Sequence, residues 1–76
     1  MKIKILGMGC ASCKKLYQNA ADAVAELALD AQIEKVEDIQ KIMAYGVLKT
    51  PAIVVDEAVK AFGRVPNKDE IKKYLR

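Results

Sequence analysis

The sequence predicts one small α/β domain in which strands and helices follow the order β-α-β-α-β-β-α. Three patterns support this fold class. Lys and Ile alternate at the start, apolar residues recur every three or four positions over 10–28, and an unbroken apolar run occupies 52–55. The chain has 76 residues, which is enough for one hydrophobic core and no second module. We therefore expect residues 1–76 to form a single domain.

The first two predicted elements are a strand and a long helix, separated by a glycine-rich loop. Met1 to Leu6 alternates Lys with Ile, which is typical of a short strand with one buried face, and Gly7-Met8-Gly9 ends it. Neither Pro nor Gly interrupts the segment from Cys10 to Ala28. Its apolar residues have helical spacing and are Cys13, Leu16, Tyr17, Ala20, Ala21, Val24 and Leu27.

The middle of the chain predicts a polar strand and a short helix. Ala31 to Val36 mixes apolar with charged residues, which suits an edge strand better than a central one. A second helical stripe follows, formed by Val36, Ile39, Ile42 and Met43. Gly46 is placed to terminate this helix.

The last three predicted elements are a hairpin and a helix. Pro51 precedes the apolar run 52–55, which is typical of a central strand, and proline is tolerated at the first position of a strand. Asp56-Glu57 offers a turn into the alternating segment 59–62. Asn67 can cap a final helix, with Glu70 reaching back toward the cap. The buried stripe of that helix is formed by Ile71, Tyr74 and Leu75.

Charge and hydropathy exclude several classes of function. Charged residues make up 30% of the chain and sum to +3, with scattered lysines, so we expect no nucleic-acid binding. No stretch approaches the about 18 apolar residues of a membrane span, and the apolar start is too short for a signal peptide. We expect a cytoplasmic protein with no membrane association. In that reducing compartment, two close cysteines indicate redox or metal chemistry.

Cys10-Ala11-Ser12-Cys13 places a C-x-x-C at the start of the long helix. The unpaired N–H groups and partial positive charge of a helix start lower a cysteine pKa below its usual value of about 8.5. Lys14 and Lys15 add positive potential, unless they only form a solvated face. Cys13 lies on the same side of the helix as Cys10, close enough to attack a mixed disulfide there. We therefore assign Cys10 as the nucleophile and Cys13 as the resolving thiol.

Two other interpretations start from the same residues. The segment from Gly7 to Cys13 matches the G-M-x-C-x-x-C loop of heavy-metal-associated domains, the copper or mercury chaperones, whose two thiolates bind a soft ion. Those domains end in a strand, whereas this chain is predicted to end in a helix. The second interpretation is that both cysteines are small, inert core residues, but a core role explains neither the spacing nor the loop.

With its dithiol, its element order and Thr50-Pro51, the whole chain resembles the small glutaredoxin-like and thioredoxin-like redox-active disulfide proteins. The resemblance implies a four-stranded mixed sheet flanked by three helices, with the C-x-x-C at the start of the first helix. It implies that Pro51 is a cis-proline opposite the dithiol and that the backbone of Thr50 pairs with a bound peptide. The alternative for Pro51 is a trans-proline that only starts a strand.

The sequence departs from these families at several positions. Gly9 precedes the first cysteine where thioredoxins have Trp, and the first strand carries no acidic residue, so proton transfer at the resolving thiol needs water or another group. The segment from Phe62 to Asn67 replaces the Gly-Gly and acidic residues with which glutaredoxins hold glutathione. Gly63 can still let a substrate backbone approach.

These observations predict a thiol-disulfide oxidoreductase that reduces protein disulfides through a Cys10–Cys13 dithiol/disulfide cycle. We expect no cofactor and no metal. The expected partners are protein disulfides and a thioredoxin-reductase-like or other dithiol electron donor, and the expected oligomeric state is a monomer. A soft-metal chaperone and a redox-sensing interaction module without turnover remain the alternatives.

Overall fold

The computed structural model describes residues 1–9 and 11–75, which form four strands and three helices. Their order along the chain is β1 (Lys2–Leu6), α1 (Ala11–Glu26), β2 (Gln32–Val36), α2 (Ile39–Ala44), β3 (Ala52–Val55), β4 (Ala58–Phe62) and α3 (Lys68–Leu75). This is the predicted order.

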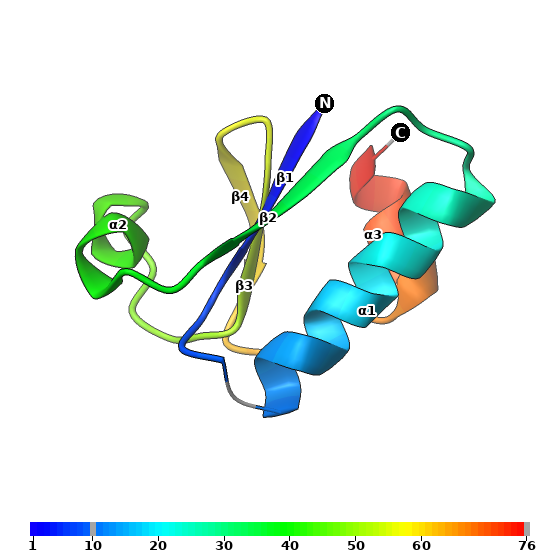
Figure 1. Cartoon of the computed structure of the whole chain (residues 1–76). Helices are drawn as coiled ribbons and strands as arrows, with labels where there is room; N and C mark the ends of the chain where they lie inside the picture. The colour runs from blue at the N-terminus through cyan, green and yellow to red at the C-terminus, as the bar shows by residue number, and fades with distance from the viewer. Residues whose placement is uncertain (10, 76) are drawn as a thin grey trace.

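The strands form one mixed sheet in the order β2-β1-β3-β4. β1 is parallel to β2 and antiparallel to β3, and β3 is antiparallel to β4. The polar strand β2 therefore lies at an edge, and the fully buried β3 lies inside the sheet. Figure 1 shows α1 and α3 together on one face of the sheet and α2 on the other. The mixed sheet and its three helices confirm the predicted α/β fold class.

The hydrophobic core consists of two clusters, one on each face of the sheet. Because successive side chains of a strand point to opposite faces, β3 contributes Ile53 and Val55 to one cluster and Ala52 and Val54 to the other. The first cluster also holds the buried residues Ile3, Ile5, Leu16, Ala20, Ala23, Ala61, Ile71 and Leu75. The second holds Leu6, Val36, Ile42 and Val47, under α2.

Sequence periodicity predicts α1 better than α2. In α1 the expected positions Cys13, Leu16 and Ala20 are buried, and Ala23 joins them. The stripe expected for α2 is wrong at Ile39 and Met43, which are each 59% exposed. A helix of six residues has fewer than two turns, so few of its side chains can face the sheet, and only Ile42 is buried.

The hairpin and the last helix form where their local sequence predicts, and in that helix Ile71 and Leu75 are buried while Tyr74 is only partly buried. Asp56 and Glu57 have φ values of 48° and 69°, which fits the two-residue turn favoured between antiparallel strands. Asn67 caps α3, because its side-chain oxygen accepts a hydrogen bond of 2.9 Å from the Glu70 amide. The carboxylate of Glu70 also accepts a hydrogen bond from Arg64 Nη2 at 2.8 Å, which joins the cap to the preceding loop.

Candidate functional site

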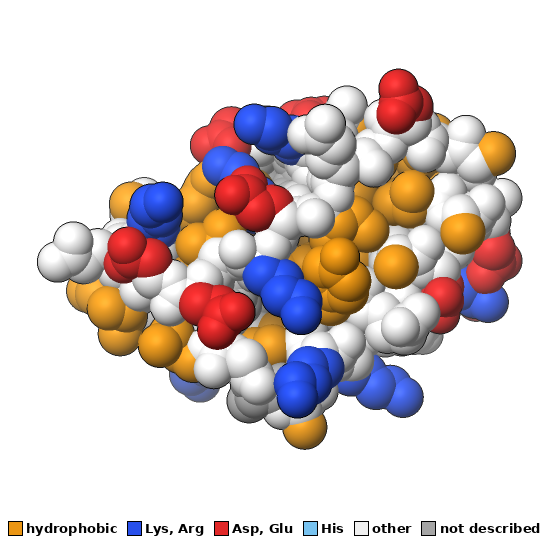
Figure 2. Space-filling view, viewed as in Figure 1, with side chains coloured by type: hydrophobic (Ala, Val, Ile, Leu, Met, Phe, Trp, Pro, Cys, Tyr) orange, Lys and Arg blue, Asp and Glu red, His pale blue; other side chains and the backbone are white. Residues whose placement is uncertain are grey.

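Cys13 lies in the first turns of α1, at the edge of the sheet where β1 and β2 end. Its side chain is 6% exposed, and it faces the loop that follows β1. The other predicted thiol, Cys10, lies outside the described residues. α1 has no acidic residue in its first turn, so no carboxylate there offsets the positive end of the helix dipole. Lys14 and Lys15, which follow Cys13 in α1, are exposed. Figure 2 shows basic side chains at this end of the molecule.

Cys13 occupies a volume that a side chain at position 7 would fill, and Gly7 has no side chain. A Cβ built on Gly7 would overlap Cys13 Sγ and would lie 3.2 Å from Cys13 Cβ. The Gly7 amide donates a hydrogen bond of 3.0 Å to the carbonyl of Val36, so the loop cannot easily move away. The same Cβ position is 3.9 Å from Cβ of Thr50. Gly7 is therefore packed between Cys13 and the residue that precedes Pro51.

Pro51 and Gly63 lie at the same end of the sheet as Cys13. The Thr50–Pro51 peptide bond is cis, Pro51 is buried and Thr50 is exposed. The Pro51 carbonyl accepts a hydrogen bond of 2.9 Å from the Gly63 amide, which extends the pairing of β3 with β4 by one step. Gly63 has a φ of 74°, in the left-handed region that favours glycine. The structure thus brings Thr50, Pro51 and Gly63 to the end where α1 begins.

A cavity of about 240 Å³ opens beside the buried sulfur. Its walls come from β1, the loop after it, α1 and the end of β2, and they are Ile5, Gly7, Gly9, Cys13, Lys14, Lys35 and Glu37. Lys35 and Glu37 carry no motif and are not among the predicted site residues. The signal that could have found them is the parallel pairing of β1 with β2, since neighbouring parallel strands end at the same edge of a sheet.

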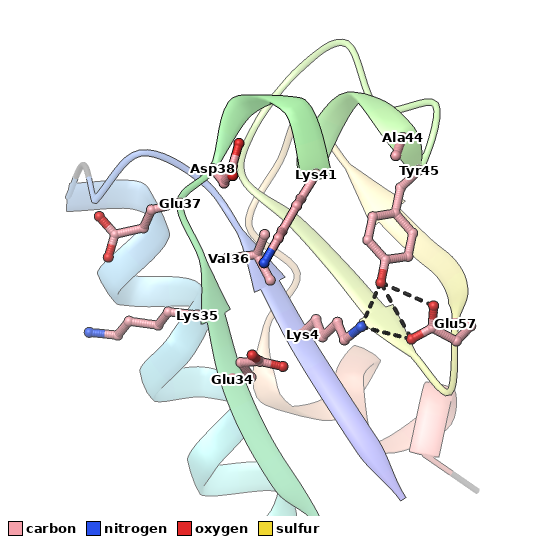
Figure 3. Close-up of a pocket in the computed structure, with 10 residues that line it drawn as sticks. All are labelled: Lys4, Glu34, Lys35, Val36, Glu37, Asp38, Lys41, Ala44, Tyr45 and Glu57. Atoms are coloured by element: carbon pink, nitrogen blue, oxygen red, sulfur yellow. Dashed lines mark hydrogen bonds and ion pairs between the residues drawn. The ribbon is translucent and has the colours of Figure 1, made fainter.

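A larger cavity of about 440 Å³ lies on the other side of β2, and no sulfur lines it. Figure 3 shows Lys4, Tyr45 and Glu57 joined at one wall. Lys4 Nζ donates to the Tyr45 hydroxyl at 2.7 Å and to Glu57 Oε1 at 2.8 Å. Hydrogen bonds from Lys4 and then Tyr45 lower the pKa of Glu57. Hydrogen bonds to Glu57 and then to Tyr45 raise the pKa of Lys4. These contacts join Tyr45, at the end of α2, and Glu57, in the turn between β3 and β4, to Lys4 of β1.

Neither a metal cluster nor a membrane-spanning helix is present in residues 1–9 and 11–75. Within these residues, no three or more His, Cys, Asp or Glu side chains are grouped so that they could hold a metal ion. No helix formed by the same residues is long and apolar enough to cross a membrane.

Comparison with known proteins gives one consistent result. The family model described as a thioredoxin domain matches residues 1–76. A curated thioredoxin of Methanothermobacter thermautotrophicus is 47% identical over 75 residues, which cover 99% of this chain and 97% of that protein. A thioredoxin of Methanocaldococcus jannaschii is 39% identical over 74 residues, which cover 97% of this chain and 85% of the relative.

Proposed function

Because this chain belongs to the thioredoxin domain family and is a thiol-disulfide oxidoreductase, we propose that Cys10 and Cys13 carry its reaction. The Cys10 thiolate attacks a disulfide of a substrate protein and forms a mixed disulfide, which releases one substrate thiolate. Cys13 then attacks the Cys10 sulfur and releases the second substrate thiolate. The products are a reduced substrate and a Cys10–Cys13 disulfide.

The position of Cys13 is the observation that carries this proposal. Its sulfur is buried against Gly7 at the start of α1, so substrate has little access to it. A buried thiol in that position suits an intramolecular attack on Cys10, three residues earlier in the chain, better than a first attack on a large protein. The family match favours this chemistry over soft-metal transfer, because the heavy-metal-associated domains end in a strand and this chain ends in α3.

We also propose roles in substrate binding for Thr50, Pro51 and Gly63. The exposed Thr50 offers its backbone to an extended substrate segment, while Pro51, which has no N–H, and Gly63 leave room for that segment. Thioredoxins act on protein disulfides and receive electrons from reductases. For this chain we propose a thioredoxin-reductase-like or other dithiol donor, a cytoplasmic location, and a monomer in which residues 1–76 form one domain.

Trapping of substrate tests the two cysteine roles. Cys13→Ser leaves the attack by Cys10 intact and removes its resolution, so mixed disulfides with proteins accumulate and are visible on non-reducing gels. Cys10→Ser lacks the attacking thiol and therefore traps no mixed disulfides. Ser12→Ala, a change between the two cysteines, is the matched control and behaves like the parent protein. Equal trapping by the two cysteine variants contradicts the assignment.

A further inference from the structure

The cavity beside Cys13 contains a carboxylate, that of Glu37, which follows β2 in the chain. A Cβ built on Gly9 would lie 3.5 Å from Glu37 Oε2, so the carboxylate rests against the residue that precedes Cys10. Figure 3 shows Glu37 and Lys35 extending to the α1 side of β2, away from the joined Lys4, Tyr45 and Glu57. Glu37 is exposed, and it lines the same cavity as the buried Cys13 sulfur.

Backbone hydrogen bonds between β1 and β2 fix the position of Glu37. Leu6 pairs with Val36 at the last step of the parallel ladder, and Gly7 donates its amide hydrogen to the Val36 carbonyl at 3.0 Å. Glu37 therefore leaves the sheet beside the loop that holds Gly7 and Gly9. On its other side, Asp38 caps α2 by accepting a hydrogen bond of 2.9 Å from the Gln40 amide. The backbone of Glu37 is thus held between two hydrogen-bonded segments.

The second step of the proposed reaction needs a proton acceptor at this position. Cys13 must lose its thiol proton to become a nucleophile, and its side chain is only 6% exposed to solvent. The cavity of about 240 Å³ has room for several water molecules, each of which takes about 30 Å³ in the liquid. We propose that Glu37 accepts the Cys13 proton through water in this cavity, an inference that rests on the cysteine roles proposed above.

The step balances in protons and electrons. The Cys13 thiol passes its proton through water to the Glu37 carboxylate, which becomes a neutral carboxylic acid. The Cys13 thiolate then forms a bond to the Cys10 sulfur, and the bond from Cys10 to the substrate sulfur breaks with its electron pair on the substrate. The departing thiolate takes up a proton, and Glu37 returns its own to solvent. The dithiol is oxidised and the substrate disulfide is reduced.

The charges around the cavity favour this transfer. Lys14 from α1 and Lys35 from β2 line its walls. Positive charge near a thiol favours its ionised form. The Lys35 ammonium lies 4.9 Å from the centre of the Tyr17 ring, which holds it on the α1 side of the sheet. Lys35 and Glu37 also line the larger cavity, whose other charged residues are Lys4, Glu34, Asp38, Lys41 and Glu57.

Stopped-flow kinetics with one equivalent of dithiobis(nitrobenzoate) separate the two steps. Attack by Cys10 releases the first nitrothiophenolate, and attack by Cys13 on the resulting mixed disulfide releases the second. We expect Glu37→Gln to leave the first phase unchanged and to slow the second by about 10- to 100-fold at pH 7. Above about pH 9 the deficit should disappear, because a thiol with a usual pKa of about 8.5 then ionises without help.

Two variants control for charge and for structure. Glu34→Gln removes the same charge from β2 but faces the other cavity (Figure 3), and both of its phases should match the parent protein. Glu37→Asp keeps a carboxylate and should retain part of the rate. The proposal is overturned if Glu37→Gln leaves the second phase unchanged, accelerates it, or slows it equally at both pH values. Loss of the first phase in the parent protein would instead overturn the proposed cysteine roles.

Discussion

Gly7 is the residue on which the position of the Cys13 sulfur depends most directly. The sequence shows a glycine-rich loop before the C-x-x-C. The structure shows why Gly7 is needed in that loop, because any side chain there would meet Cys13. The missing Cβ leaves the volume that Cys13 Sγ fills. The loop cannot yield easily, because its amide is bonded to the carbonyl of Val36. One hydrogen atom in place of a methyl group therefore leaves the space that the Cys13 sulfur occupies.

Replacing Gly7 by Ala should disturb both stability and reaction. The added methyl group overlaps Cys13 Sγ, and overpacking of this kind costs about 1–3 kcal/mol. We expect a lower urea midpoint and a changed rate in the second phase of the stopped-flow assay. Gly46→Ala is the control: its Cβ would meet nothing within 4 Å, but its φ of 77° makes alanine strained. That variant should lose stability and keep normal kinetics, and a normal second phase in both variants would refute the role of Gly7.

The sequence could predict some site residues and not others. Cys10 and Cys13 were predicted from residue type and spacing, and Thr50, Pro51 and Gly63 from the comparison with the families that the chain resembles. The structure places the four described residues at one end of the sheet. Glu37 and Lys35 have ordinary types and no motif. Their place beside Cys13 depends on the register of β1 with β2, which local patterns do not contain.

At the scale of elements, α1 and α3 are joined by charge as well as by apolar contact. Ile71 and Leu75 of α3 pack in the same cluster as Leu16 of α1. Beyond that cluster, Glu26 at the end of α1 contacts Lys68 Nζ at 2.5 Å and Lys72 Nζ at 2.6 Å. Hydrogen bonds from Lys68, and next from Lys72, lower the pKa of Glu26. Folding and the charge of this carboxylate are therefore linked.

Acid should weaken this junction. The folded pKa of Glu26 lies below the value of 4.5 usual for a glutamate, so its contribution is complete above that value and is lost as the pH falls through the folded pKa. Thermal melts at pH 7 and about pH 3 measure this effect. We expect the parent protein to lose more melting temperature between the two conditions than Glu26→Gln, which has no carboxylate to protonate. Equal losses would show that the contact contributes nothing to stability.

The elements also show where local patterns stop being informative. α1 spans several turns, so its periodicity identified the buried face, with Ala23 as an addition. α2 has six residues, and its pattern predicted burial of Ile39 and Met43, which are exposed. Over so short a helix, the approach to the sheet decides which side chains are covered, and that approach is set by tertiary packing.

At the scale of the whole molecule, the two faces of the sheet are unequally covered. Two helices cover one face, and α2 alone covers the other, where Lys4, Tyr45 and Glu57 continue the cover with polar contacts. The deeper cluster contains Ile53, which is fully buried in the interior strand β3. Leu48, at 87% exposure, lies at the other extreme. In a small domain most of the stability has to come from buried apolar residues such as Ile53.

Two apolar truncations should separate these extremes. Ile53→Ala removes buried methyl groups and should reduce the free energy of unfolding by about 2–5 kcal/mol. If that variant does not fold, Ile53→Val should show a loss of about 0.5–1.5 kcal/mol. Leu48→Ala should change the same quantity by less than about 0.5 kcal/mol. Urea denaturation measures all three, and a larger loss for Leu48→Ala than for Ile53→Val would contradict the assigned core.

The outer edge of β2 has a consequence for how copies of this protein behave together. An edge strand presents backbone donors and acceptors to which another chain can add a strand, and that pairing leads to aggregation. Glu34 and Lys35 are exposed on β2 and alternate in sign. Charged side chains on an edge strand, lysine especially, disfavour the addition of a second strand. The polarity that marked this segment as an edge therefore also protects the protein at high concentration.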